Sequence, residues 1–221
     1  MKNNIRTKFD ISNDEVLKFI EPYVKEKKIL DLGCVEHELK NIHKQRIWVH
    51  DYLISVGKEV IGVDFLQEPV RKLNKRGYKI LCQNVENLKV SKKFDVIFAG
   101  ELIEHLSSPG KFLESVKKYM DNDTIFIITT PNAFSFNRFI KIIYQRTNNP
   151  SCNPEHVSWY SPNTLFQLLS RYNLIIEKLD YAHYSSKIPS LKRFIVHAGC
   201  RLLGKRFKET MIAVVNLNNP S

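Results

Sequence analysis

The sequence has no long apolar run, which argues against a membrane-spanning protein. No stretch reaches the roughly 18 consecutive apolar residues that a spanning helix needs. The first residues, MKNNIRTKFDISNDEV, also lack the apolar centre of a secretion signal. With only 8 glycines and 9 prolines in 221 residues, the composition is not that of a fibrous or disordered chain. We therefore expect a folded protein of the cytoplasm.

Cysteine is also scarce in this chain. The four cysteines lie far apart and no two form a C-x-x-C pair: Cys34, Cys82, Cys152 and Cys200. Structural zinc sites and disulfide frameworks depend on closely spaced cysteines, so neither is expected here.

Acidic residues are in the minority, with 23 Asp and Glu against 34 Lys and Arg and a formal net charge of +11. Part of the excess lies in residues 187–208, where a helical pattern carries seven Lys or Arg and no acid. Such a basic helix is either a solvated face or a contact for RNA, a phosphorylated substrate or the surface of an anionic membrane. DNA is not an expected partner.

Seven strand-like segments alternate with helical patterns along the chain. In order they are KILDLG, EVIGVD, YKILCQN, FDVIFAG, TIFIITTPN, NLIIEKLDY and TMIAVVNL. Continuous apolar strands of this kind indicate a parallel sheet buried on both faces. The sequence predicts an α/β protein with a Rossmann-like, doubly wound, seven-stranded sheet, mostly parallel with an antiparallel last strand. Ligands of such sheets bind at the carboxyl ends of the strands.

No repeat or linker divides residues 1–221, so a single domain is expected. Within it we distinguish an N-terminal helix in residues 1–27, an insertion at 132–160 that can cover a substrate, and the basic helix in 187–208. Function is then expected where the insertion meets the ends of the strands.

Serine marks two predicted helix starts. Ser12 precedes an apolar helical pattern and Glu15 stands three residues later, so the two side chains can form a capping box. Ser161 precedes Pro162, a residue that suits the first position of a helix.

The first strand lacks the glycine-rich turn that dinucleotide cofactors need. A pyrophosphate favours G-x-G-x-x-G before a helix, and here only Gly33 is present, so NAD and FAD fit poorly. S-adenosylmethionine carries adenosine without a phosphate and needs chiefly an acid for its ribose hydroxyls. Asp64, at the end of the second strand, is placed for that role, while Asp31 lies near the amino acid end of the ligand. The alternative for Asp64 is a simple strand cap.

The order of these segments resembles that of the class I S-adenosylmethionine-dependent methyltransferases, from about residue 27 to 216. ILDLGC is similar to the first motif of that family, IGVDF to its ribose-binding acid, CQNVENL to its adenine-contacting turn, and FDVIFAGELIEHL with TIFIITTPN to its central strands. The resemblance implies a cofactor site lined by Asp31, Gly33, Asp64, Asn84 and Val85, with Ala99 and Gly100 under the methionine moiety.

One segment departs from the family pattern. CVEHELKNIHKQRIW replaces the usual glycine-rich continuation, so that Val35 and His37 stand where the family has glycine. We expect the loop from Cys34 to Arg46 to be rebuilt so that the cofactor still binds. The alternative is a methyltransferase-like binding protein that has lost S-adenosylmethionine.

The stretch GELIEHLSSPG places two acids and a histidine directly after the fourth strand. If this stretch is helical, Glu101, Glu104 and His105 lie at i, i+3 and i+4, on one face. Two carboxylates and an imidazole can hold Mg²⁺ or Mn²⁺, and His156 in the insertion is the best candidate for a fourth ligand. The alternatives are a solvated polar helix face and a surface histidine.

This pattern also resembles the small-RNA 3′-terminal 2′-O-methyltransferases and the quinone-biosynthesis O-methyltransferases. By that resemblance Glu101, Glu104, His105 and His156 are metal ligands. Without a metal, His105 or His156 can act as general base on a hydroxyl. Both versions predict catalysis of O-methylation by these residues, on a small-molecule or glycan hydroxyl, with an RNA 3′ end and a lipid-like quinone precursor as the alternatives.

Overall fold

The computed structural model describes residues 9–35, 47–144, 153–183 and 191–218. The expected rebuilding of the loop after the first strand therefore lies largely outside the described residues, His37 included. The same holds for part of the 132–160 insertion and for the start of the basic segment.

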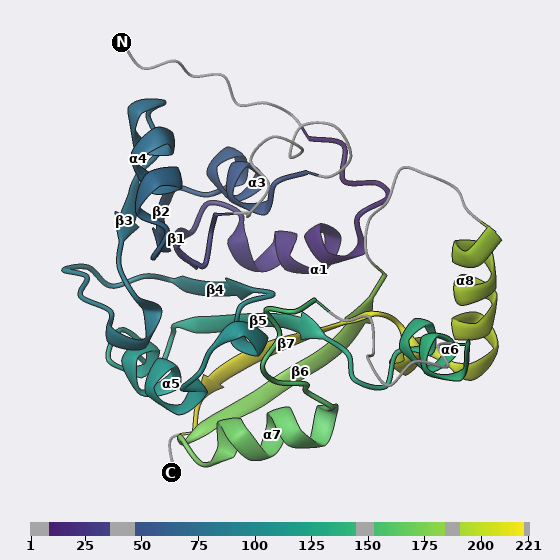
Figure 1. Cartoon of the computed structure of the whole chain (residues 1–221). Helices are drawn as coiled ribbons and strands as arrows, with labels where there is room; N and C mark the ends of the chain where they lie inside the picture. The colour runs from purple at the N-terminus through teal and green to yellow at the C-terminus, as the bar shows by residue number, and fades with distance from the viewer. Residues whose placement is uncertain (1–8, 36–46, 145–152, 184–190, 219–221) are drawn as a thin grey trace.

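A seven-stranded sheet forms the centre of the structure (Figure 1), in the order β3-β2-β1-β4-β5-β7-β6. The strands are parallel except β7, which runs antiparallel to both β5 and β6. This confirms the predicted Rossmann-like architecture. The bounds are β1 (Lys28–Leu32), β2 (Glu59–Asp64), β3 (Ile80–Cys82), β4 (Val96–Gly100), β5 (Ile125–Pro131), β6 (Leu174–Ala182) and β7 (Thr210–Leu217).

The direction of winding reverses beside β1. From β1 the chain proceeds outward to β2 and β3, and then returns to place β4 on the other side of β1. Leu32 at the end of β1 pairs with Val63 on β2 and with Ala99 on β4. Connections that leave in opposite directions open a crevice at the carboxyl ends of these strands, and this crevice positions the functional site.

Alternating residues on the strands bury opposite faces of the sheet. Leu30 and Leu32 belong to one core cluster with α5 (Pro109–Lys117) and α7 (Pro162–Ser170), while Ile29 belongs to another with α1 (Glu15–Val24) and α3 (Val49–Val56). Figure 1 shows α1 and α3 above the sheet and α5 and α7 below it. The helix α4 (Gln67–Lys75) and the short helix η1 (Val85–Asn87) complete the first half. The two-residue period of a strand thus supplies both cores.

The predicted cap of the first helix is wrong by two residues. Asp14 is the N-cap of α1, and its carboxylate accepts a hydrogen bond from Leu17 N, so the helix begins at Glu15 rather than after Ser12. Both residue types cap well, and the sequence pattern alone does not choose between them. At α7 the prediction is confirmed, because Ser161 and Thr164 form a reciprocal capping box with Pro162 at the first position.

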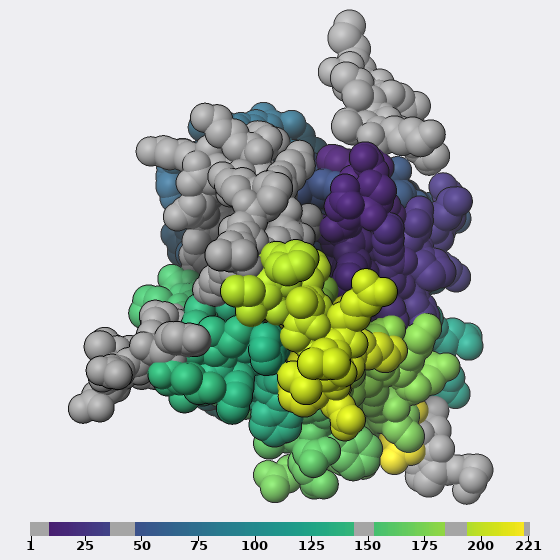
Figure 2. Space-filling model, turned by 90° about the vertical axis from the view of Figure 1, so that its right-hand side faces the viewer, coloured from purple at the N-terminus to yellow at the C-terminus, as the bar shows by residue number. Residues whose placement is uncertain are grey.

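Two helices, α6 (Phe136–Tyr144) and α8 (Leu191–Leu203), lie together beside the end of the sheet. Figure 2 looks onto them, with α8 in yellow-green next to α6 in teal. A short helix, η3 (Lys205–Phe207), connects α8 to β7. In the part of the chain that the structure describes, none of the helices has the length and apolar character needed to traverse a bilayer.

Candidate functional site

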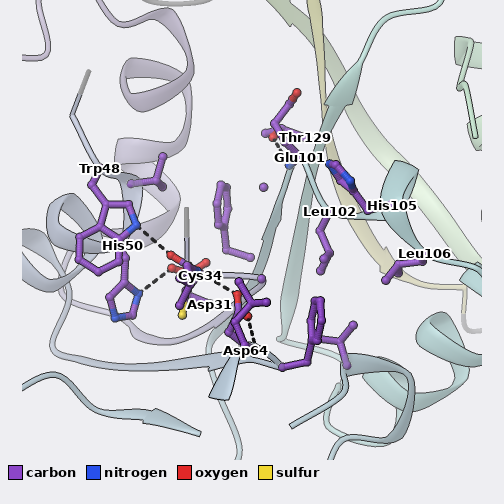
Figure 3. Close-up of a pocket in the computed structure, with 18 of the residues that line it drawn as sticks. Asp31, Cys34, Trp48, His50, Asp64, Glu101, Leu102, His105, Leu106 and Thr129 are labelled. Carbon is purple, nitrogen blue, oxygen red and sulfur yellow. Dashed lines mark hydrogen bonds and ion pairs between the residues drawn. The ribbon is translucent and has the colours of Figure 1, made fainter. Parts of the chain in front are cut away.

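A cavity of about 850 Å³ opens at the carboxyl ends of β1, β2 and β4. It brings together most of the predicted cofactor residues, and Figure 3 labels Asp31 and Asp64 among them. Those that line it are Asp31, Gly33, Asp64, Asn84, Val85 and Gly100. Of the predicted catalytic residues, Glu101 and His105 also line it.

Asp64 lies at the end of β2 with its carboxylate held by the backbone. One oxygen accepts a hydrogen bond from Val35 N at 3.0 Å, and the other accepts one from Leu66 N at 2.9 Å. An ionised carboxylate has about four acceptor positions, so capacity remains for further donors such as ribose hydroxyls. Val35 stands at a position where the family that the sequence resembles has glycine. Its contact with Asp64 is the hydrogen bond donated by its backbone N–H.

Asp31 is paired with a histidine that the sequence did not reveal. His50 Nδ1 lies 2.7 Å from Asp31 Oδ2, and both side chains are buried. Burial raises the pKa of Asp31, while the hydrogen bond to His50 opposes that shift. Figure 3 shows His50 reaching Asp31 from the side of Trp48. The pair holds one carboxylate of the cavity in a fixed orientation.

The wall behind His50 is tightly packed. Trp48 Nε1 donates to the carbonyl of Cys34 at 2.8 Å, and the rings of Trp48 and His50 lie 5.2 Å apart. Gly62 on β2 provides the space that Cys34 and His50 occupy, because a Cβ at position 62 would lie 2.6 Å from Cys34 Sγ and 2.9 Å from His50 Cε1. A larger residue at position 62 would displace the imidazole from Asp31.

We expect the His50→Ala variant to lose about 2–4 kcal/mol of unfolding free energy, since it leaves a cavity and a buried carboxyl without its partner. The loss should be larger at pH 8 than at pH 5. As the pH rises, the folded protein must either bury the charge of Asp31 or keep its proton, and both cost free energy of unfolding. In the wild type the hydrogen bond from His50 opposes this cost, and in the variant nothing replaces it. Urea unfolding at the two pH values measures this.

The matched control is Tyr78→Phe, which removes only the hydroxyl that donates to Asp51 at 2.7 Å. It should cost less than about 1 kcal/mol. Equal losses in the two variants would contradict the role given to His50.

Four further predicted cofactor residues have distinct surroundings. Gly33 adopts φ +69°, and a Cβ there would meet Leu102 Cδ1 at 2.8 Å. Asn84 caps η1 by accepting from Glu86 N, and Val85 is buried beside it. Ala99 is fully buried in the core on the α5 side and is not among the residues that line the cavity. The alternation of strand residues turns Phe98 and Gly100 to the cavity instead.

The stretch after β4 is not the helix that would place three polar residues on one face. Glu101 has φ +50°, and its N–H donates to Thr129 on β5, so the chain turns sharply as it leaves the sheet. Only Ile103–His105 forms a short 3₁₀ helix, η2, before α5 begins at Pro109. The hydrogen bonds from Glu101 N to Thr129 hold the start of this connection in a turn and not in a helix.

A cluster of three potential metal ligands nevertheless forms here. Glu104, His105 and His156 each offer a ligand atom, and these atoms lie within 4.8 Å of one another. Glu101 is not part of this group. The imidazole rings of His105 and His156 meet edge to face at 4.6 Å between centroids. The cluster adjoins the cavity, because His105 is one of the lining residues.

Backbone contacts bring the distant His156 into place. The carbonyl of Glu104 accepts hydrogen bonds from Val157 N at 2.9 Å and Ser158 N at 3.1 Å. The ring of Trp159 contacts the ring of His156 at 5.2 Å, and the guanidinium of Arg138 on α6 lies 3.1 Å from the Trp159 ring centroid. The insertion is thus attached to the very residue whose side chain enters the cluster.

The electrostatics of the cluster follow from burial. Glu104 is 1% exposed, and desolvation together with the nearby Glu101 raises its pKa to about 8, although Thr130 donates a hydrogen bond to it at 2.9 Å. Desolvation and the proximity of His105 and Arg138 lower the pKa of His156. Near neutral pH the site therefore contains a protonated acid and a neutral imidazole.

Comparison with known proteins identifies the family of this chain. A model described as a methyltransferase domain matches residues 6–179. A ubiquinone biosynthesis O-methyltransferase of Pelagibacter ubique (strain HTCC1062) is 26% identical over 195 residues, which cover 84% of this chain and 74% of that protein.

Solved structures share the fold. An S-adenosylmethionine-dependent methyltransferase from Archaeoglobus fulgidus has a TM-score of 0.58 at 20% identity and covers 91% of each chain. A small RNA methyltransferase has a TM-score of 0.60 at 19% identity, covering 95% of this chain and 25% of its own. The chain belongs to the methyltransferase domain family and is a class I S-adenosylmethionine-dependent methyltransferase.

Proposed function

We propose that this methyltransferase transfers the methyl group to an oxygen, on a hydroxyl of a small molecule or glycan, beside Glu104, His105 and His156. The observation that carries the proposal is the convergence of these three side chains beside a cavity that both His105 and Asp64 line. Methyl transfer is an in-line attack, so the protein chiefly has to align the two reactants.

The cavity suits the cofactor in size and chemistry. Its 850 Å³ lies within the range of pockets that enclose small ligands, and its lining is predominantly apolar with a few carboxylates. We assign the ribose to Asp64 and the amino acid end to the side of Asp31. When bound, S-adenosylmethionine supplies a methyl group on a positively charged sulfur, and the carboxylates of the cavity favour that charge.

Two imidazoles are available to activate a hydroxyl. The lowered pKa of His156 keeps a neutral ring available to accept a proton. His105 lies at the cavity wall, within ring contact of His156. General base catalysis of this kind contributes about 10²- to 10⁴-fold.

The same three residues fit a divalent cation. Within the described part of the chain, Glu104 Oε1 and His156 Nδ1 are buried without a hydrogen-bond partner. His105 Nε2 lies 4.0 Å from Glu104 Oε1, too far for a hydrogen bond, whereas two ligand atoms each about 2.1 Å from one ion can be that far apart. Glu104, His105 and His156 would hold Mg²⁺ or Mn²⁺, which lowers the pKa of a bound hydroxyl.

The choice of oxygen as acceptor is supported by a relative that matches most of this chain, although shorter matches include N-methyltransferases of Papaver somniferum and Thalictrum flavum. The Pelagibacter protein is named as an O-methyltransferase of ubiquinone biosynthesis, and it covers most of this chain. An RNA 3′ end is the second candidate, since the fold overlays on a small RNA methyltransferase. Transfer of radiolabelled methyl to a panel of phenols, sugars, amines and 3′-hydroxyl RNA tests both, and labelling of amines alone would contradict O-methylation.

Chelation separates the metal from the imidazole mechanism. If the cluster uses a cation, EDTA should lower turnover at least about 100-fold and Mn²⁺ or Mg²⁺ should restore it. Turnover that is indifferent to EDTA would refute the metal proposal and leave the imidazoles as bases. The control is the Kd for S-adenosylmethionine, which EDTA should not change.

The affinity for Mn²⁺ should also depend on pH. A cation needs the ionised carboxylate, and without a cation Glu104 keeps its proton up to a pKa of about 8. Affinity should therefore rise from pH 6 to pH 8 and level off above, as measured by calorimetry. An affinity that is constant across this range would contradict ligation by Glu104.

A further inference from the structure

Two helices outside the sheet present a large apolar surface, which we call the α6–α8 surface. It comprises the exposed side chains Phe139, Ile142 and Ile143 of α6 and Phe194, Ile195, Leu202 and Leu203 of α8. Leu202 is 86% exposed and Phe194 is 72% exposed. Single exposed apolar residues are ordinary, but seven of them on two helices that pack together are typical of a contact site.

The two helices form one surface because they are packed together. Gly199 of α8 faces Phe136 of α6 so closely that a Cβ would lie 2.2 Å from the ring. Val196 and Cys200 on the same side of α8 are buried. The apolar residues of α8 that remain outside therefore cannot turn inward without separating the pair, and Figure 2 shows both helices on one face.

The charge of this surface has one sign. Neither α6 nor α8 contains an acid, and residues 194–208 carry Arg201, Lys205, Arg206 and Lys208. Acids that pair with this segment come from elsewhere in the chain: Asp180 meets Lys205 at 2.8 Å, and Glu15 meets Lys208 at 2.9 Å. The chain as a whole has a formal charge of +11.

We propose that the α6–α8 surface docks on the face of an anionic lipid bilayer. Apolar side chains on a basic helix can enter the boundary between headgroups and acyl chains, while Lys and Arg contact anionic headgroups. A second copy of the chain would oppose basic surface to basic surface. A nucleic acid could pair with the charges and stack bases on phenylalanine, but it would leave Ile142, Ile143, Leu202 and Leu203 without an apolar partner.

Docking in this way would bring the site near the lipid. Arg138 of α6 lies over Trp159, and Trp159 contacts His156, so a single ring separates α6 from the cluster. A hydrophobic acceptor dissolved in the bilayer would then reach the cavity from the side on which the cluster lies. The docking itself does not require the proposed function.

Cosedimentation with vesicles tests the proposal without cofactor or acceptor. The full chain should bind vesicles of phosphatidylcholine mixed with phosphatidylglycerol at least about tenfold more tightly than vesicles of phosphatidylcholine alone. The double variant Phe139→Ser with Leu202→Ser should weaken binding to the anionic vesicles by about tenfold or more, because both apolar contacts are lost.

The matched control is Phe166→Ser with Ile175→Ser, two exposed apolar residues on α7 and β6, outside the α6–α8 surface. It should bind like the wild type, and calorimetry with S-adenosylmethionine should show all three proteins folded. No preference for anionic vesicles, or equal loss in both double variants, would overturn the proposal. So would vesicle binding that single-stranded RNA abolishes while the Phe139 and Leu202 changes leave it intact.

Discussion

The Glu104→Gln variant is expected to lower kcat for methyl transfer by about 10²- to 10⁴-fold and to leave the Kd for S-adenosylmethionine nearly unchanged. Glutamine has the shape of glutamate and can still accept the hydrogen bond from Thr130. It cannot ionise, however, so it cannot take up the negative charge that Glu104 would need as the ligand of a cation. Glu104 does not line the cavity, so cofactor contacts should be retained.

Steady-state kinetics together with calorimetry check this expectation. The fold should not be weakened, because the change replaces a buried acid that already favours its neutral form. Glu114→Gln on the exposed face of α5 is the control and should behave as wild type. A kcat within about threefold of wild type would contradict the role of Glu104.

The Asp64→Asn variant should raise the Kd for S-adenosylmethionine by about 10- to 100-fold, or about 1.4–2.8 kcal/mol. Asparagine keeps one acceptor oxygen, while the carboxylate now meets Val35 N and Leu66 N with separate oxygens and must also accept ribose hydroxyls. The variant therefore has too few acceptors for all four donors. S-adenosylhomocysteine should lose the same factor, because it carries the same ribose.

Calorimetric titration of both compounds measures the effect. Asp123→Asn, an exposed acid in the turn before β5, is the matched control and should bind normally. Because Asp64→Asn also removes a partner from the backbone, its melting temperature must be recorded beside the affinity. Unchanged affinity in a folded Asp64→Asn protein would contradict the assignment of the ribose.

The sheet could be predicted from sequence because its signals are local. Seven apolar runs separated by helical patterns define the strands, and Ser161 with Pro162 defines the start of α7. The position of Asp64 follows from the same pattern, since it is the last residue of β2. Ala99 is not among the residues that line the cavity, because neighbouring strand residues point to opposite faces of the sheet.

Other features depend on contacts between distant residues. His50 and Asp31 are 19 residues apart in sequence, and no motif links a helix start to a strand end at that spacing. The turn at Glu101 depends on Thr129, 28 residues further on. Periodicity within ELIEHL therefore favoured a helix that the hydrogen bonds of the adjoining strand prevent. His156, by contrast, was found from its residue type, and the contacts of Val157 and Ser158 to Glu104 place it.

A crystal structure with S-adenosylhomocysteine and Mn²⁺ tests the central claim most directly. We expect the ribose hydroxyls within hydrogen-bond distance of Asp64, the sulfur facing His105, and anomalous scattering from manganese among Glu104, His105 and His156. Adenosine bound elsewhere, or a sulfur turned away from these three residues, would contradict the account.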